Sequence, residues 1–395
     1  MTTVGARPIS ATAVTARSLA PDLARGVMLL LIALAHAHLY LYGRPISMHG
    51  RGYPVSEAVT DRVVVLLQMT FVDDRARPMF ALLFGYGIVQ LLRRQTSGGA
   101  DAVAVRRLVR RRGWWMVLFG FLHALLLFGA DIIGSYGLLA VALAGVLIGA
   151  RDRTLLIVVA LWIVPVVAFR AWLGLRQREA SESWLPSMSI TDPLVAAVSR
   201  VVEWVVVSIS ASIFLLIPAL LLGVWAARRR LLDEPERHRQ LLIRTAVLGV
   251  GLAVLGGLPM ALITASWWPE QSVAATALAG VAHTLTGYAG GVGYAAIAGL
   301  VAIRIRERGR HGAVVTALAA SGQRSMTCYL LQSVVFVAVL AAYGGGLGDR
   351  FGLADTAVLA TATWAGTVLL AEFMRRHGHR GPAEVLLRRL TYGRR

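Results

Sequence analysis

The sequence predicts an all-α fold: a polytopic membrane helical bundle with about ten transmembrane helices and one interfacial or re-entrant helix. Of its 395 residues, 57% are apolar and only 15% are charged, whereas a soluble domain usually carries about a quarter charged residues. The apolar residues form long runs, and a run of about 20 such residues spans a bilayer as a helix. This composition excludes an ordinary cytosolic enzyme. It also excludes a disordered chain, because disordered chains are poor in apolar residues.

The apolar runs indicate a single transmembrane domain, residues 23–374, between two cytoplasmic tails. The tails are residues 1–22 and the arginine-rich segment 375–395. The first run has full length and no persuasive cleavage site, so we expect it to remain as a helix and not to be removed as a signal peptide. The connections are too short for a second domain. The ten predicted spans are 23–43, 76–93, 113–130, 132–150, 154–173, 203–227, 241–264, 274–303, 323–343 and 353–374.

Arginines at the ends of these runs predict the orientation, because basic connections stay on the cytoplasmic side of a membrane. One such connection, residues 93–112, contains seven arginines and a single acid, Asp101. We therefore expect a multi-pass protein of the cell (plasma) membrane with both termini in the cytoplasm. The other basic segments are 228–239, 304–310 and the chain from 375, whereas the connections 129–131 and 266–272 contain no arginine.

The segment 56–74 does not fit this alternation as a span. Its apolar core runs only from residue 63 to 72, and a run of that length is more often interfacial or re-entrant than spanning. If it crossed the membrane, the basic connection 93–112 would lie outside, against the charge rule. We therefore place it on the outer side.

The net charge of +19 does not indicate a nucleic-acid partner. All forty basic residues are arginines, and they stand in short clusters at the ends of apolar runs, where they face lipid headgroups. The expected partner is the lipid bilayer. The single cysteine, Cys328, permits no intrachain disulfide.

Ionisable groups at membrane depth are costly, so each is a candidate site residue. Arg25 opens the first predicted helix, and His36 follows about 16 Å further along the axis, near the middle of the membrane. A neutral imidazole is the best general base near pH 7, so His36 is a candidate catalytic residue. The alternatives are a snorkelling anchor for Arg25 and a purely structural interhelical hydrogen bond for His36.

His123 lies at a matching depth in the third predicted span, so the two histidines could line one cavity. Asp131 follows about 12 Å further along the axis if the helix continues, and we therefore expect that it cannot orient the His123 ring. It would serve a histidine of another helix, bind substrate near the outer face, or simply end its helix. Tyr136 follows in the next span.

Other polar residues form bands inside later spans. His283 stands in a band with neighbouring threonines, and Gln332 stands in another; both are candidate substrate-binding residues, or else packing residues that hydrogen-bond between helices. Arg77 could bind an anionic group or pair with Asp74. No metal-ligand spacing, no phosphate-binding Gly-rich motif with Lys and no Gly-x-Ser-x-Gly elbow is present.

Several motifs resemble those of the bacterial YeiB-like family of polytopic membrane proteins, which is also called domain of unknown function 418. The resemblance covers nearly the whole chain. The motifs are Pro21-Asp22-Leu23-Ala24-Arg25-Gly26, Arg77-Pro78-Met79-Phe80 with Leu83-Phe84-Gly85-Tyr86-Gly87, Gly129-Ala130-Asp131-Ile132 with Tyr136-Gly137, Gly322-Gln323-Arg324-Ser325-Met326-Thr327 with Tyr329-Leu330-Leu331-Gln332-Ser333, and Gly381-Pro382-Ala383-Glu384 to Leu390-Thr391-Tyr392-Gly393.

The family is more distantly similar to two groups of membrane acyltransferases, heparan-glucosaminide acetyltransferase and the acyltransferase-three group. In the latter, an arginine, ten residues and a histidine mark the first helix, and Arg25 and His36 have this spacing. The resemblance implies transfer of an acyl (acetyl) group from cytoplasmic acyl-CoA to a hydroxyl or amine of a glycan, a lipid headgroup or a small metabolite.

The same resemblance implies roles for individual residues. His36 or His123 would take a proton from the acceptor or carry the acyl group, and hydroxyls such as that of Tyr136 would stabilise the oxyanion. Acetyl-CoA would be a co-substrate, with no metal involved. Arginines suit its phosphates because they bind phosphate bidentately; those expected at the cytoplasmic mouth are Arg25, Arg106, Arg107 and Arg110.

Two other functions fit the sequence. A transporter or permease for a small or lipidic solute would explain the polar bands, since transporters bind near the midplane, but no inverted repeat is visible. A non-catalytic scaffold would tolerate Asn or Gln at His36 and His123. A homo-oligomer is compatible with each of these functions.

Overall fold

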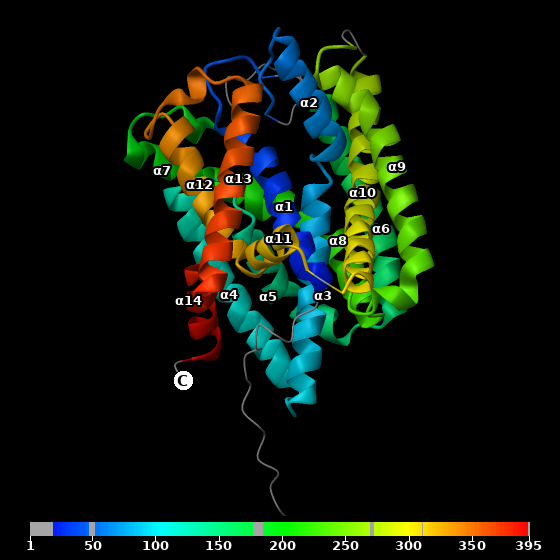
Figure 1. Cartoon of the computed structure of the whole chain (residues 1–395). Helices are drawn as coiled ribbons and strands as arrows, with labels where there is room; N and C mark the ends of the chain where they lie inside the picture. Colours follow the sequence, from blue (N-terminus) through cyan, green and yellow to red (C-terminus); the bar gives the residue numbers. More distant parts are fainter. Residues whose placement is uncertain (1–18, 47–51, 177–184, 269–271, 310, 394–395) are drawn as a thin grey trace, which may run out of the picture.

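The computed structural model describes residues 19–46, 52–176, 185–268, 272–309 and 311–393. This part of the chain is helical, without a β-strand, which confirms the predicted all-α class. The helices pack into one bundle (Figure 1). Their bounds are α1 (Leu19–Ala37), α2 (Val59–Phe71), α3 (Ala76–Ser97), α4 (Ala102–Leu126), α5 (Ile133–Gly149), α6 (Asp152–Arg176), α7 (Pro193–Glu203), α8 (Ile213–Arg228), α9 (Arg239–Thr264), α10 (Val273–Glu307), α11 (Ala313–Gln323), α12 (Ser325–Leu340), α13 (Leu353–Arg376) and α14 (Pro382–Tyr392).

Five helices of the described chain are long and apolar enough to cross a membrane: α1 with the turn after it, α6, α9, α10 and α13. The bent pairs α7–α8 and α11–α12 raise this number to seven if each pair is one span. The predicted spans 76–93, 113–130 and 132–150 are also helical, as α3, α4 and α5. They are shorter or more polar: the apolar part of α4 has only the 14 residues 113–126 after its arginine cluster, and α5 has only 17 residues.

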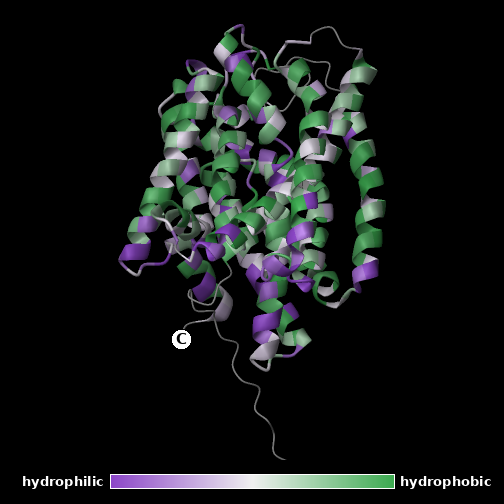
Figure 2. Cartoon of the chain, turned by 45° about the vertical axis from the view of Figure 1, so that its right-hand side comes forward, coloured by the Kyte–Doolittle hydropathy of each residue, from purple (hydrophilic) through white to green (hydrophobic). Residues whose placement is uncertain are grey.

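The outer surface of the bundle is apolar over much of its height, as a bilayer requires. Figure 2 shows hydrophobic residues along the helices, whereas hydrophilic residues gather at one end, around the hairpin of α3 and α4. Large exposed apolar patches are rare on soluble monomers. Exposed apolar side chains of this belt include Leu161, Val164, Leu194, Val198, Val247, Leu248, Leu255, Val358 and Leu369. The chain is therefore a helical membrane protein.

The predicted short segment on the outer side corresponds to α2, which has only 13 residues. At 1.5 Å per residue it is about 20 Å long, too short to cross a bilayer alone. It packs against α9 and α13. Its exposed apolar side chains recur every fourth residue and so form one stripe: Val59, Val63, Leu67 and Phe71.

The predicted span 323–343 is broken at its start, because α11 and α12 meet at an angle of 86° at Arg324. In Figure 1, α11 lies across the bundle while α12 runs along it. Close packing of α11 on α1 holds this break, since Gly26 and Gly322 let the two backbones approach directly. A Cβ on Gly322 would overlap the carbonyl oxygen of Asp22, and one on Gly26 would overlap that of Leu318.

The C-terminal segment from residue 375 is not only a basic tail, because α14 folds back against α4 and α12. Glu384 ties α14 to the broken helix pair. Its carboxylate accepts hydrogen bonds from the amide nitrogens of Met326 (2.7 Å) and Thr327 (3.2 Å) and from the Thr327 hydroxyl (2.5 Å). These are free amides of the first turn of α12, so Glu384 acts as an N-terminal cap from another helix.

We expect Glu384→Ala to destabilise the protein by about 1–2 kcal/mol, the usual cost of losing a helix cap. Thermal unfolding in detergent measures this loss, and limited trypsin digestion should then cleave α14 sooner. The matched control is Glu307→Ala, because Glu307 forms only an exposed ion pair with Arg239, which contributes little. Equal unfolding temperatures for the two variants would contradict the capping role.

Candidate active site

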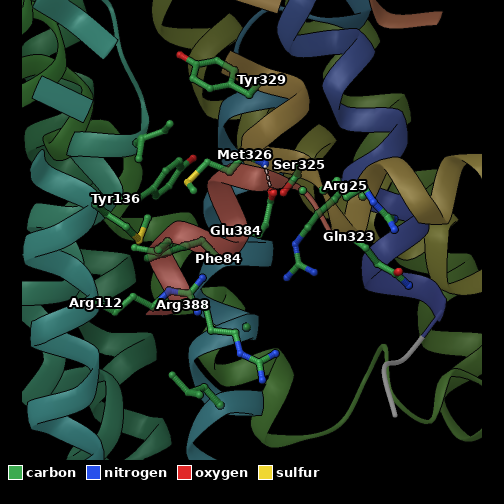
Figure 3. Close-up of a pocket in the computed structure, with 18 of the residues that line it drawn as sticks. Arg25, Phe84, Arg112, Tyr136, Gln323, Ser325, Met326, Tyr329, Glu384 and Arg388 are labelled. Atoms are coloured by element: carbon green, nitrogen blue, oxygen red, sulfur yellow. Dashed lines mark hydrogen bonds between the residues drawn. The ribbon is translucent and has the colours of Figure 1, made fainter. Parts of the chain in front are cut away.

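A cavity of about 320 Å³ opens between α1, α3, α4, α5, α14 and the break between α11 and α12. Figure 3 shows Arg112 and Arg388 toward one end of this cavity and Tyr329 at the other, with Tyr136 and Met326 between them. The cavity thus joins the arginine-rich end of the bundle to its interior.

Arginines from five parts of the chain surround the mouth. Arg25 is held in place by Asp22 (3.2 Å) and by the carbonyl oxygen of Leu83 (3.3 Å), and it lines the cavity. The predicted companions of Arg25 are exposed on α4 and do not line the cavity: Arg106, Arg107 and Arg110. The arginines that do line it beside Arg25 are Arg94, Arg112, Arg324, Arg380 and Arg388.

Tyr392 of α14 completes this basic mouth. Burial raises the pKa of its hydroxyl, and the positive charges of Arg94 and Arg112 oppose that shift. Arg94 comes from α3, Arg112 from α4 and Arg388 from α14, so the sequence alone did not show that these guanidinium groups converge. An arrangement of this kind binds several phosphate oxygens at once.

The interior of the cavity is apolar and aromatic. The Tyr136 ring is buried and packs on Phe80 and Phe84, with ring centroids 5.4 and 4.9 Å apart. Tyr136 and Tyr329 both line the cavity, so two hydroxyl-bearing side chains lie at its inner part. Tyr136, which was predicted to bind substrate, is thus one of the residues that line the cavity.

His123 and Asp131 are in direct contact, which corrects the expectation that Asp131 cannot orient the His123 ring. The distance from His123 Nδ1 to Asp131 Oδ1 is 2.9 Å. The expectation was wrong because it assumed a continuous helix to residue 130. Instead α4 ends at Leu126, the amides of Leu127 and Phe128 both bond to the His123 carbonyl, and the chain turns back.

The Asp131 carboxylate is fixed by the start of α5. It accepts hydrogen bonds from the amides of Ile133 (3.0 Å) and Gly134 (2.6 Å), and a helix N-terminus stabilises a negative charge. Gly120 makes room for it on α4, because a Cβ there would overlap both Asp131 Oδ2 and the Gly134 amide. The two helices are therefore closely apposed where the carboxylate meets the imidazole.

Ser333 of α12 is the third member of this group, and the sequence analysis did not single it out as a site residue. Its Oγ lies 2.9 Å from His123 Nε2, and all three side chains are nearly fully buried. The sequence signal that could have indicated Ser333 as a site residue was its position at the end of the motif from Tyr329 to Ser333. Only the tertiary structure, which places α12 beside the end of α4, brings the hydroxyl to the imidazole.

The His36 ring also contacts Tyr329. Its ring centroid is 5.9 Å from that of Tyr329 and 5.0 Å from that of Phe128, whereas His123 is 5.0 Å from Tyr329. Both histidines therefore contact one cavity-lining ring, although neither lines the cavity itself. His36 is only partly buried, and no described residue hydrogen-bonds to its ring.

The remaining predicted residues lie away from the cavity. His283 bonds to the buried guanidinium of Arg75 (2.9 Å), and Arg77 pairs with Asp74 (2.7 Å), which also accepts a bond from Thr284. Gln332 is buried and donates to the Leu29 carbonyl. None of His283, Arg77 and Gln332 lines the cavity. In the described chain, no cluster of three or more His, Cys, Asp or Glu side chains is arranged to hold a metal ion.

Comparison with known proteins finds one family model and two bacterial relatives that are similar to this chain. A model described as "Protein of unknown function (DUF418)" matches residues 226–394. The chain is 27% identical over 353 residues to uncharacterized protein YxaH of Bacillus subtilis (strain 168), covering 82% of this chain and 80% of YxaH. It is 26% identical over 340 residues to uncharacterized protein YeiB of Escherichia coli (strain K12), and the match covers 79% of this chain and 80% of YeiB. These matches support the resemblance to the YeiB-like DUF418 family that the sequence motifs predict.

Proposed function

We propose that this protein is a membrane acyltransferase that moves an acyl group, such as acetyl, from acyl-CoA to a hydroxyl or amine acceptor at or across the membrane. One observation carries the proposal. A single cavity leads from a mouth lined by arginines to an aromatic interior, where Tyr329 contacts both His36 and His123. Acyl-CoA has the matching chemistry: phosphates at one end, and a slender arm with a thioester at the other.

The donor would enter from the arginine-rich end. Arg94, Arg112 and Arg388 would bind its phosphates through charge-assisted hydrogen bonds. The arm would extend past Phe84 toward Tyr136, so the thioester would stop near the aromatic floor. Because basic segments stay on the cytoplasmic side, this mouth would face the cytoplasm, with the protein in the plasma membrane and both termini inside.

His123 is suited to act as the base. Asp131 accepts from its Nδ1, which sets the ring tautomer and raises the basicity of the other nitrogen. His36, which has no protein hydrogen-bond partner among the described residues, is the alternative base, because its ring also contacts Tyr329. The acceptor would be a glycan, a lipid headgroup or a small metabolite.

The donor site is tested by thermal unfolding of the detergent-purified protein with acetyl-CoA, longer acyl-CoAs and free CoA. A ligand at a hundred times its Kd adds about 2.7 kcal/mol to the free energy of unfolding, so a clear rise in unfolding temperature is expected. Replacing Arg112 and Arg388 together by Ala should weaken acetyl-CoA binding at least tenfold, because hydrogen bonds to charged groups contribute about 1.5–3 kcal/mol each.

The matched control replaces Arg106 and Arg107, which lie on the same helix as Arg112 but outside the cavity. That variant should bind acetyl-CoA as the parent protein does. Equal loss in both variants would indicate a general charge effect. Absence of stabilisation by every CoA compound would refute the proposed donor.

One feature favours the alternative of a transporter. Asp74, Arg75 and His283 form a buried polar cluster inside the bundle, apart from the cavity, and buried ionisable groups in membranes often line ion or substrate pathways. Transport would appear as solute flux into sealed proteoliposomes that Arg75→Ala abolishes. Flux without any CoA binding would replace the acyltransferase proposal.

A further inference from the structure

Ser333, His123 and Asp131 form a continuous hydrogen-bonded chain in the bundle interior. The two links, from Asp131 Oδ1 to His123 Nδ1 and from His123 Nε2 to Ser333 Oγ, are both 2.9 Å long. Three separate elements contribute the residues: the end of α4, the turn before α5, and α12. All three side chains are buried, with exposed fractions of at most 3%.

The order of partners determines the direction of proton transfer. An ionised Asp131 only accepts hydrogen bonds, so the imidazole proton lies on Nδ1. Nε2 then carries a lone pair, which accepts a hydrogen bond from the Ser333 hydroxyl. A serine paired with a histidine that a carboxylate orients is an activated nucleophile, whatever the fold that supplies it.

We propose that Ser333 is the acyl carrier of the reaction, so that transfer proceeds through an acyl-serine ester. This inference rests on the proposed acyltransferase function. In the first step Ser333 Oγ attacks the thioester carbonyl carbon, the carbon–sulfur bond breaks, and the Ser333 proton passes through His123 to the departing CoA sulfur. In the second step the acceptor hydroxyl or amine attacks the ester carbonyl carbon and His123 takes its proton. The bond between that carbon and Ser333 Oγ breaks, and His123 returns the proton to Oγ.

Two buried hydroxyls near Ser333 are available to stabilise the oxyanion. Tyr40 packs on Phe128 and Phe336 next to Ser333, and Tyr329 precedes Ser333 by four residues on the same face of α12. Neither hydroxyl has a hydrogen-bond partner of ordinary geometry in the described chain, although both side chains are more than nine-tenths buried. An unpaired buried donor is costly, and a ligand oxygen would satisfy it.

Tyr329 also connects the donor cavity to the serine. Its side chain lines the cavity and contacts the His123 ring, so it separates the expected position of the thioester from Ser333. The acyl-serine mechanism therefore requires the Tyr329 side chain to move, so that the thioester can reach Ser333.

The experiment incubates the purified protein with acetyl-CoA without acceptor, quenches in acid, and measures intact mass and the modified peptide. We expect one acetyl group on Ser333, released by hydroxylamine as an ester. Ser333→Ala should abolish the adduct and lower turnover about a thousandfold or more, while Ser333→Cys should form a thioester. The matched control is Ser135→Ala, because this buried serine bonds only to backbone carbonyl oxygens and its loss should leave the adduct unchanged.

An adduct on His36, or one that persists in Ser333→Ala, overturns the proposal. So does the absence of any adduct, provided that acetyl-CoA stabilises the protein and free CoA is released once acceptor is present. If no CoA compound binds, the acyltransferase proposal fails instead. A fluorophosphonate probe then tests Ser333 alone: labelling that Ser333→Ala abolishes supports an activated serine, and its absence overturns it.

Discussion

Replacing Asp131 by Asn should lower the acyl-transfer rate by a factor on the order of 10³–10⁴. The substitution keeps the size of the side chain but removes the acceptor-only carboxylate that holds the proton on His123 Nδ1. The amide group would present a donor to that nitrogen, so Nε2 would carry the proton and could no longer accept one from Ser333 or from the acceptor. Steady-state kinetics should show this loss in kcat, with KM for acetyl-CoA nearly unchanged.

A structural effect of Asp131→Asn is separated from a catalytic one by two measurements. The Asn oxygen can still accept from the amides of Ile133 and Gly134, so the unfolding temperature should fall only slightly. Stabilisation by acetyl-CoA should persist, since Asp131 does not line the donor cavity. A variant with full activity would show that Asp131 only caps α5. Gly120→Ala should resemble Asp131→Asn in activity, because its methyl group displaces the carboxylate.

Gly322→Ala should destabilise the fold by about 3 kcal/mol or more, the upper range for overpacking. The added Cβ would overlap the backbone carbonyl oxygen of Asp22 on α1. A flexible side chain could move aside, but here two helix backbones are in contact and one of them must shift. The thermal unfolding temperature in detergent measures the effect, and acetyl-CoA binding should weaken as well because Gly322 lines the cavity mouth.

Gly366→Ala is the matched control for this prediction. Gly366 also lies within a helix, α13, but a Cβ there meets no atom within 4 Å. Because Ala favours a helix over Gly by about 1 kcal/mol, this variant should be as stable as the parent protein or slightly more stable. Equal destabilisation of both variants would mean that the α1–α11 contact is not as close as described.

The helical membrane fold follows from the sequence because it depends on composition and on local run length. Apolar runs must be helical in a bilayer, since each backbone polar group needs an internal partner. The same one-dimensional counting placed His36 and His123 at similar depths, and in the structure both rings contact Tyr329. Family motifs supplied Arg25 and Tyr136, which line the cavity. None of these inferences requires knowing which helices are neighbours.

The sequence failed wherever the position of a residue depended on a turn or on a neighbouring helix. Axial counting separated Asp131 from His123, but a chain reversal after Leu126 brings them into contact. Arg106 and Arg107, which the sequence predicted to bind the donor phosphates, do not line the cavity. Arg388 does line it, because Glu384 fixes α14 against α12.

The sequence by itself therefore determined a helical bundle in a membrane, its basic end and its intramembrane histidines. Only the tertiary structure decided that Ser333 completes the group with His123 and Asp131. The physical reason is range. Hydrophobicity and helix length depend on residues that are close together in the sequence. A hydrogen bond between side chains 210 residues apart forms only when the fold brings α4 and α12 together.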